Sequence, residues 1–351
     1  MTGKKMRALV FYGPKNFKVE EMPIPQISKD EILVKVKYAG VCGTDNRIYQ
    51  GTKKINPPRI TGHEFVGEIV EVGKNIKEFS VEERVTVYPM ISCGMCYACK
   101  AGRKNICTNR ITIGYEIDGG FAQYIKIPSI AIKSGNVIKV PENLRDEVVA
   151  ISEPIAAAYH GIKRCEIKEG QTVIIVGAGP IGLFHTQLAS LNKPSRVIVI
   201  EPIEEKRSLA LRMGATDTID PINENVLERV LEITNREGAD VVIIDVGIPK
   251  VIEDSLAYVK KGGTFLVFAG CPEGSRINID PNVIHYREIN FTGSSASTPE
   301  IHREVLELLS AGKLNVENLI SEILPLDKWQ QAFEMKNNYI GIKVLIDPWM
   351  E

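Results

Sequence analysis

Thr172-Val-Ile-Ile-Val-Gly-Ala-Gly-Pro-Ile-Gly182 joins a run of strand-forming residues to glycines in the pattern G-x-G-x-x-G. A strand that leads directly into this pattern, followed by a helix, begins a dinucleotide-binding βαβ unit. The first two glycines allow a tight turn and close approach of a pyrophosphate, which the N–H groups at the helix N-terminus can bind. The candidate cofactor-binding residues of this turn are Gly177, Gly179, Pro180, Ile181 and Gly182.

Glu201 ends the next expected strand, 19 residues beyond Gly182. A carboxylate there accepts hydrogen bonds from the ribose hydroxyls of NAD and repels the 2′-phosphate of NADP. We therefore expect NAD as the cofactor, with Arg207 as a further contact. The alternative is that Glu201 is only a solvated strand end, and that Lys206 or Arg207 binds a 2′-phosphate.

Strands and helices alternate from residue 171 onward, which predicts parallel strands with right-handed crossovers. The expected fold class is therefore α/β, with a doubly wound Rossmann domain. The expected strands are 172–176, 197–200, 216–219, 241–245 and 264–269, and the expected helices are 146–164, 181–191, 203–213, 225–236 and 251–260.

The first part of the chain instead has short β-rich segments separated by Gly, Pro and Asn turns, which predicts a small antiparallel β-barrel. The last part no longer continues the βα alternation, so we expect it to return to the first domain. One domain would contain residues 1–148 and 289–351, and the cofactor-binding domain residues 149–288. The expected elements outside that domain are strands 7–12, 17–20, 32–39, 65–72, 85–89, 120–127, 289–291 and 342–346 and helices 299–310 and 327–336.

Potential metal ligands occur at two places in the barrel part and once after it. Cys42 comes first, His63 and Glu64 lie between a turn and a strand, and Glu153 follows later. Zinc binds thiolate, imidazole and carboxylate, and three protein ligands leave one position open for substrate. A lone histidine is more often hydrogen-bonded than metal-bound, so the prediction depends on the combination.

Four cysteines within fifteen residues form a second group of potential ligands. Four thiolates can close a tetrahedral zinc site without an open position, so this zinc would be structural. An iron–sulfur cluster is the alternative, although the fourth cysteine is eight residues beyond the third and is not followed by proline. The cysteines are Cys93, Cys96, Cys99 and Cys107, in a lobe of about residues 90–110.

The composition limits partners and location. The 351 residues, 44% hydrophobic and 25% charged, can bury a full core in two domains. A net charge of −1 gives no reason to expect a nucleic-acid or membrane partner, and no apolar run approaches the roughly 20 residues of a membrane helix. The seven cysteines are an odd number and four are clustered, which favours metal thiolates and a cytoplasmic location.

These motifs resemble those of zinc-dependent medium-chain dehydrogenases/reductases, the alcohol dehydrogenase superfamily, and especially its polyol (sorbitol/iditol) and threonine dehydrogenase branch. The resemblance covers essentially the whole chain. It implies a GroES-like β-barrel catalytic domain, zinc at both sites, NAD, a small alcohol or polyol substrate, and a homotetramer or homodimer. Its markers are Gly40-Val-Cys-Gly-Thr-Asp45, Gly62-His-Glu-Phe-Val-Gly67, the four-cysteine lobe, Asp118-Gly-Gly-Phe-Ala-Gln-Tyr124, Ser152-Glu-Pro154 and the glycines of 177–182.

The resemblance implies that Cys42 and His63 bind a catalytic zinc. Its third protein ligand would be either Glu64 or Glu153, and the sequence leaves that choice open. Zinc would act as a Lewis acid toward an alcohol whose carbinol carbon gives a hydride to the nicotinamide.

Asp45 and Thr44 would support this chemistry. Asp45 would hold the His63 ring, because ligating histidines usually donate their second N–H to such a group. Thr44 would hydrogen-bond the substrate oxygen and begin a proton relay. Many relatives have a histidine as the outer relay group where this chain has Arg47. A permanently charged guanidinium is a poor proton shuttle, so the relay would end in water, or Arg47 would contact the cofactor pyrophosphate.

Three functions are compatible with these residues. The leading hypothesis is NAD-dependent oxidation of a secondary hydroxyl of a polyol, sugar or related small alcohol. Oxidation of an amino-acid alcohol such as L-threonine is the second, and Arg47 disfavours it because threonine dehydrogenases use the missing histidine. The third is a cofactor-binding structural protein without turnover, which the complete set of ligands disfavours. Residues 294–298 replace the Arg-Tyr pair of sorbitol dehydrogenases and would offer hydroxyls to a polyol or simply cap a helix.

The remaining histidines and several aromatic residues are interpreted as structural. His302 has no partner at a metal-ligand spacing. Tyr115 could wall the substrate site, but aromatic residues in β-rich regions usually serve packing.

Overall fold

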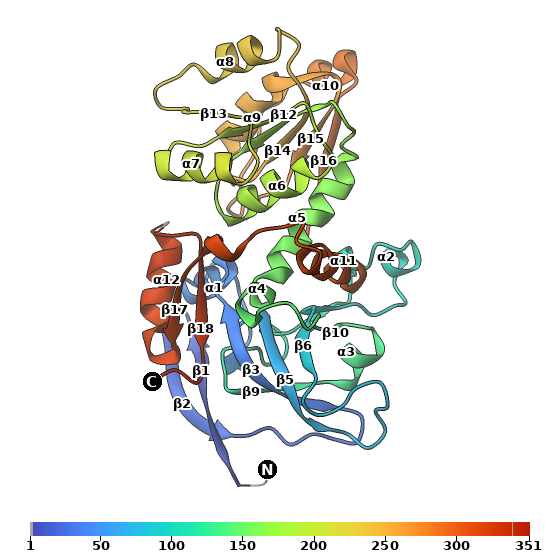
Figure 1. Ribbon diagram of the computed structural model, residues 1–351, viewed down its shortest axis with the longest axis vertical. Coiled ribbons are helices and arrows are strands. Elements are labelled where there is room, and N and C mark those ends of the chain that lie inside the picture. The colour runs from blue at the N-terminus through green and yellow to red at the C-terminus, as the bar shows by residue number, and fades with distance from the viewer. Residues whose placement is uncertain (1–2, 339) are drawn as a thin grey trace. The chain divides into compact units, whose positions relative to one another are not determined.

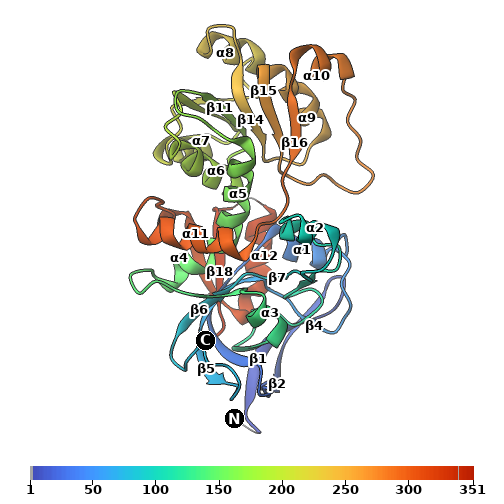
Figure 2. The same cartoon turned by 90° about the vertical axis from the view of Figure 1, so that its right-hand side faces the viewer.

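The computed structural model describes residues 3–338 and 340–351, and the chain divides into two compact units (Figures 1 and 2). Unit 1 comprises Met1–Ala156 and Ser297–Glu351, and unit 2 comprises Ala157–Ala296. No helix within the described residues is long and apolar enough to cross a membrane.

Unit 1 is built on two largely antiparallel sheets (Figure 1). The seven-stranded sheet has the order β10-β6-β5-β3-β18-β17 with β9 paired to β3, and a three-stranded sheet has the order β2-β1-β4. The strands are β1 (Lys5–Gly13), β2 (Asn16–Pro23), β3 (Ile32–Gly40), β4 (Arg59–Ile60), β5 (Glu64–Val72), β6 (Arg84–Val87), β9 (Tyr124–Ile127), β10 (Val137–Lys139), β17 (Ile320–Pro325) and β18 (Lys343–Asp347), with β7 (Met90–Ile91) and β8 (Ile111–Thr112) as a separate pair.

The pairing of β3 with β5 prepares the candidate metal site. The two strands are antiparallel, and their register places Gly40 opposite Glu64. Because Cys42 follows the end of β3 and His63 precedes β5, this register brings the two motifs together at one end of the sheet. Strand pairing alone thus brings Cys42 and His63 close together, although they lie apart in the sequence.

The C-terminal segment packs onto the N-terminal strands. Trp329 and Phe333, on α12 (Trp329–Asn337), have ring centroids 5.5 and 5.8 Å from that of Phe17 on β2. The other helices of unit 1 are α1 (Gly43–Tyr49), α2 (Tyr97–Lys100), α3 (Ser129–Lys133), α4 (Asp146–Ala150), the start of α5 (Ser152–Cys165) and α11 (Pro299–Ser310). Helix α11 has the bounds expected from the sequence, because Thr298 caps it and Pro299 occupies its first turn.

Unit 2 contains a six-stranded parallel sheet of order β13-β12-β11-β14-β15-β16. This is the 3-2-1-4-5-6 order of the doubly wound fold, so the expected fold class is confirmed. The strands are β11 (Thr172–Val176), β12 (Arg196–Ile200), β13 (Asp217–Ile219), β14 (Ala239–Ile244), β15 (Val259–Val267) and β16 (Asn290–Gly293). The helices are α6 (Pro180–Ser190), α7 (Glu204–Arg212), α8 (Val226–Ile233), α9 (Pro249–Ser255) and α10 (Pro281–Arg287), besides the rest of α5.

Two details of unit 2 differ from the expectation. Strand β15 begins at Val259, within the segment expected to be helical, and β16 pairs in parallel with β15. Unit 2 therefore continues to Ala296 rather than ending at 288, and it begins at Ala157 rather than 149. The crossover before β16 is α10, which has no buried residue and hence no apolar stripe by which the sequence would reveal a further βα unit.

Candidate functional site

Cys42 is held at the point where β3 gives way to α1. It is the N-cap residue of α1, and the backbone N–H of Cys42 donates to Asp45 Oδ2 at 2.9 Å. The preceding N–H, that of Val41, donates to the carbonyl of Val344 on β18 at 2.9 Å. These bonds fix the backbone of Cys42 from two sides. The sequence did not predict α1, which is only seven residues long.

The loop that presents His63 is held by the segment that begins at Asp118. The N–H groups of Gly119 and Gly120 donate to the carbonyls of Ile60 and Gly62, both at 2.8 Å. A Cβ atom on Gly119 would lie 2.1 Å from the oxygen of Gly62, so only glycine permits this contact. The Asp-Gly-Gly-Phe motif thus supports the turn before His63.

Cys42, His63 and Glu64 each offer one ligand atom, and these atoms lie within 4.8 Å of one another. Glu153 is not part of this tight group, although its carboxyl group interacts electrostatically with His63 and Glu64. His63 and Glu64 are buried, with 5% and 1% exposure. The structure therefore brings three of the four candidate ligands together. The fourth, Glu153, is close enough for the charges of His63 and Glu64 to change its pKa.

Asp45 lies beside this group without bonding the imidazole directly. Its Oδ1 is 3.8 Å from His63 Nδ1, which is too long for a hydrogen bond. Both atoms are buried and lack a hydrogen-bond partner among the residues described. Asp45 thus anchors the backbone of Cys42, and its contact with His63 is electrostatic.

The charge balance around Cys42 fits a bound cation. Burial alone would lower the pKa of His63, but Cys42, Asp45 and Glu64 outweigh burial and raise that pKa to about 10. Burial raises the pKa of Asp45 to about 6 and that of Glu153 to about 7. Because the carboxyl groups of Asp45 and Glu153 resist ionisation while His63 holds its proton, the site favours added positive charge, which a dication with thiolate, imidazole and carboxylate ligands would supply. The residues present fit zinc.

Lys343 is a residue of this site that sequence reasoning missed. Its Nζ forms an ion pair with Glu64 Oε2 and donates to the carbonyl of Val41 at 3.1 Å. The other oxygen of Glu64, Oε1, is buried and has no hydrogen-bond partner within the described ranges. Glycine at position 40 makes room, since a Cβ there would lie 2.4 Å from Glu64 Oε2. Glu64 therefore keeps one oxygen available to a metal ion.

Tyr115 also belongs to the site. Its ring lies edge-on to that of His63, with centroids 5.3 Å apart, and Thr44 lies close enough to its hydroxyl to lower the pKa of that group against the larger effect of burial. The ammonium of Lys53 lies 5.1 Å from the centre of the same ring. The structure thus places Thr44, the predicted relay residue, beside a second hydroxyl that the sequence assigned to packing.

The four cysteines of the 90–110 lobe also converge, with all sulfur atoms within 4.8 Å of one another. Cys93 and Cys107 have sulfurs 3.4 Å apart, and Cys96 and Cys107 3.9 Å, so no disulfide joins them. Tetrahedral zinc with Zn–S bonds of about 2.3 Å separates its sulfurs by about 3.8 Å. The backbone N–H of Cys99 lowers the pKa of Cys96 to about 5, which favours a thiolate. This arrangement fits a structural zinc.

The glycine-rich turn of unit 2 has the geometry of a phosphate-binding site. Gly177 has a φ of +103°, and a Cβ on Gly182 would lie 1.9 Å from the Gly177 oxygen. A Cβ on Gly179 would meet no described atom within 4 Å, so the space above this residue is open. Gly179 caps α6, with Pro180 and Ile181 in the first turn. The N-terminus of an eleven-residue helix therefore faces a space that can admit an anion.

Glu201 is tied to this turn. Its Oε2 accepts from the N–H of Ala178 at 2.8 Å and its Oε1 from that of Ile203 at 3.1 Å. Arg207, the other expected cofactor contact, is engaged elsewhere: its guanidinium pairs with Asp220 at 3.0 Å and donates to the carbonyl of Glu201 at 2.7 Å. The structure thus orients Glu201 toward the turn and leaves Arg207 committed to protein partners.

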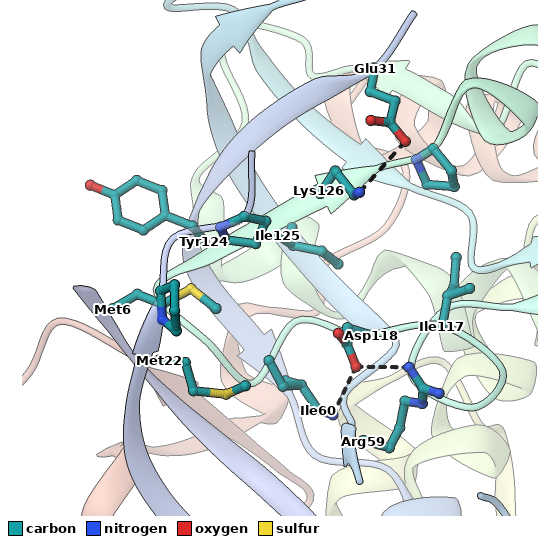
Figure 3. Close-up of a pocket in the computed structure, with 14 residues that line it drawn as sticks. Met6, Met22, Glu31, Arg59, Ile60, Ile117, Asp118, Tyr124, Ile125 and Lys126 are labelled. Carbon is teal, nitrogen blue, oxygen red and sulfur yellow. Dashed lines mark hydrogen bonds and ion pairs between the residues drawn. The ribbon is translucent and has the colours of Figure 1, made fainter. Parts of the chain in front are cut away.

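A separate hollow of about 400 Å³ lies in unit 1 beside β9, β1 and β4 (Figure 3). Ion pairs border it, Arg59 with Asp118 at 2.9 Å and Lys126 with Glu31 at 3.8 Å. None of the candidate metal ligands lines this hollow, so it is distinct from the site around Cys42.

Comparison with known proteins gives consistent matches. The family model of the alcohol dehydrogenase GroES-like domain matches residues 28–142, and that of the zinc-binding dehydrogenase matches residues 180–311. The chain is 34% identical to an L-threonine 3-dehydrogenase of Bacillus licheniformis, over 97% of this chain and 99% of the relative. It is 32% identical to a sorbitol dehydrogenase of Bacillus subtilis, over 98% of both chains. A crystal structure from Sinorhizobium meliloti with NADP bound, described as a zinc-binding dehydrogenase, has a TM-score of 0.93 and 35% identity, over 98% of this chain and 100% of that chain.

These similarities extend over almost the entire chain and cover both units. They agree with the parallel sheet of unit 2, the antiparallel sheets of unit 1 and the two groups of zinc-type ligands. The protein is thus an oxidoreductase that uses zinc and a nicotinamide cofactor. The chain belongs to the zinc-dependent medium-chain dehydrogenase/reductase family, the alcohol dehydrogenase superfamily.

Proposed function

We propose that this protein oxidises a secondary hydroxyl of a polyol, sugar or related small alcohol to the ketone, with NAD as hydride acceptor. The observation that carries the proposal is the group of half-buried Cys42 with buried His63 and Glu64, whose ligand atoms lie within 4.8 Å of one another. The 32% identity to the sorbitol dehydrogenase supports the substrate class.

We assign the first zinc to Cys42, His63 and Glu64, with Glu153 as the neighbouring carboxylate. Zinc held there would supply Lewis acidity toward the oxygen of an alcohol. Lys343 neutralises one oxygen of Glu64 and leaves the other for the metal. Asp45 holds Cys42 in place through its backbone N–H. The four cysteines of the lobe hold the second zinc, whose role is structural.

We assign Thr44 to the hydrogen bond with the substrate hydroxyl. The Thr44 oxygen can accept a hydrogen bond from that hydroxyl while its own hydrogen points toward Tyr115. Burial raises the pKa of Tyr115 well above its usual value, so the phenol stays neutral. Thr44 and Tyr115 therefore orient the substrate hydroxyl, and the proton that this hydroxyl loses goes to solvent water. Arg47 is exposed on α1 and takes no part in this pair.

The cofactor belongs to unit 2 in this proposal. The Gly177–Gly182 turn binds the pyrophosphate, and Glu201, oriented by two backbone N–H groups, accepts hydrogen bonds from the ribose. Because Arg207 is engaged by Asp220, we favour NAD over NADP. A homo-oligomer and a cytoplasmic location complete the proposal. None of the seven cysteines, which all lie in the described part of the chain, forms a disulfide, which suits a reducing compartment.

L-Threonine is a second candidate substrate, favoured by the 34% identity to the threonine dehydrogenase. One experiment separates the two candidates. Reduction of NAD is followed with polyols, sugars, simple secondary alcohols and L-threonine, using protein with zinc intact, stripped and restored. The proposal predicts turnover on polyols or sugars that disappears without zinc and returns with it. Turnover on L-threonine alone would favour the second candidate, and no turnover on any alcohol would reject both.

A further inference from the structure

His302 lies on α11 and is completely buried. It contacts the first turn of α5, the helix that contains Glu153. Its Nε2 is 2.6 Å from the Oγ of Ser152, a residue 150 positions earlier in the chain. Ser152 is the first residue of α5 and directly precedes Glu153. All three residues belong to unit 1.

The hydrogen bonds of Ser152 determine which ring nitrogen of His302 carries the proton. Ser152 Oγ also lies 2.6 Å from the carbonyl oxygen of Val149, which can only accept. The single hydroxyl proton therefore goes to Val149, and His302 donates to Ser152 from Nε2. The other nitrogen, Nδ1, is a buried acceptor without a hydrogen-bond partner in the described part of the chain. Burial, with a contribution from Arg303, lowers the pKa of His302 to about 3, so the ring is neutral.

The side chain of Ser152 thereby links three helices, of which the third is distant in the sequence. Val149 belongs to α4, Ser152 begins α5, and His302 lies on α11. Tyr88 holds the ring of His302 from another side: the two ring centroids are 6.0 Å apart, and the Tyr88 hydroxyl accepts from the N–H of Ser297 at 2.7 Å. The direction of the first turn of α5 is therefore set by buried hydrogen bonds as well as by packing.

Glu153 depends on this support because its own carboxyl group is not tethered. Burial and the charges of His63, Glu64 and Lys343 act on that group, but no side chain within 3–338 and 340–351 donates a hydrogen bond to it. The position of the Glu153 carboxyl group is thus determined by the backbone at the start of α5. A small rotation of that turn would move the carboxylate relative to Cys42 and His63.

We propose that His302 is a positioning residue for the metal centre, which acts through Ser152 to fix the first turn of α5 and the carboxylate of Glu153. This inference rests on the proposed function of that centre. The neutral, Nε2-protonated ring is suited to the task because it provides a directed donor without bringing a charge next to the ligands. A leucine would fill much of the volume but would leave the second acceptor site of Ser152 unused.

The test compares His302→Leu, Ser152→Ala and His302→Gln in the full-length chain. The amide nitrogen of glutamine can replace Nε2–H as donor, whereas leucine cannot. Co²⁺ alone is titrated into protein whose four-cysteine lobe retains its metal, and the thiolate-to-cobalt absorption of Cys42 reports binding. Loss of an outer support typically weakens metal affinity about 10- to 100-fold. We expect His302→Leu and Ser152→Ala to bind Co²⁺ at least about 10-fold more weakly, with an altered spectrum, and His302→Gln to stay within about 3-fold of the parent.

Thermal unfolding and the metal content of the lobe are measured alongside, and Ser152→Ala keeps the test valid if His302→Leu does not fold. Unchanged Co²⁺ affinity and spectrum in Ser152→Ala and in a folded His302→Leu would overturn the inference. Equal weakening in His302→Gln would also overturn it, because the loss would then not follow the donor. If the parent binds Co²⁺ as expected but oxidises no alcohol, the proposed function fails while the positioning role stands.

Discussion

Lys343 Nζ and Glu64 Oε2 form an ion pair in which the two side chains are only 3% and 1% exposed. Burial alone would lower the pKa of Lys343, but Glu64 and Cys42 outweigh burial and raise it, so the ammonium stays charged. The pair links the last strand of unit 1 to β5 and gives Glu64 a fixed counter-ion next to the candidate metal ligands.

Lys343→Met should destabilise the protein, because it leaves the Glu64 carboxylate buried without its counter-ion. Removing one partner of a buried pair typically costs about 3–5 kcal/mol. We expect the free energy of unfolding in urea to fall by about 3 kcal/mol. The matched control is Lys133→Met at an exposed position of α3, which should change it by less than about 0.5 kcal/mol. Equal effects of the two substitutions would show that the pair contributes nothing specific.

Glu201→Ala should shift the cofactor preference. It removes the carboxylate that accepts from Ala178 and that would repel a 2′-phosphate. We expect the KM for NAD to rise by about 10-fold, the size of one lost charge-assisted hydrogen bond, while NADP is accepted more readily. Steady-state kinetics with both cofactors measure the change. An unaltered ratio of kcat/KM for NAD and NADP would remove the role assigned to Glu201.

His302 should make stability depend on pH in acid. The folded pKa of about 3 lies below the usual value of about 6.5, because burial and Arg303 disfavour the charged ring. The unfolded chain therefore binds this proton first as the pH falls, and the contribution of the neutral ring is lost between about pH 6.5 and 3. Wild type should lose roughly 2 kcal/mol relative to His302→Gln between pH 7 and pH 5. Urea unfolding at both pH values tests this, and parallel losses in the two proteins would contradict the buried neutral ring.

Much of the fold could be predicted because its signals are local. The strand and glycines of 172–182 and the cap and proline at 298–299 specify their elements through backbone requirements that lie within a few residues. Short elements without an apolar stripe, such as α1 and α10, leave no comparable pattern. The sequence therefore predicts an end of unit 2 before β16, whereas unit 2 of the structure includes this strand.

The residues of the candidate site also fall into those that local sequence patterns predict and those that they do not. Motif residues such as Cys42 and His63 could be identified because thiolate and imidazole at family spacing indicate zinc. Lys343, in an apolar strand, and His302, on a helix, have no such spacing, and their partners Glu64 and Ser152 lie 279 and 150 residues away. Only tertiary structure reveals that these two polar side chains are buried and bonded.

The most direct test of the account compares Cys42→Ala with Cys96→Ala for zinc content, NAD binding and turnover on the best alcohol of the panel. Cys42→Ala should lose the zinc of the first site, retain zinc in the lobe, bind NAD as the parent does and show no turnover. Cys96→Ala should mainly lower the thermal stability, because we propose that the lobe has a structural role only. Full turnover in Cys42→Ala after loss of its zinc would contradict the assignment of the chemistry to the group of Cys42, His63 and Glu64.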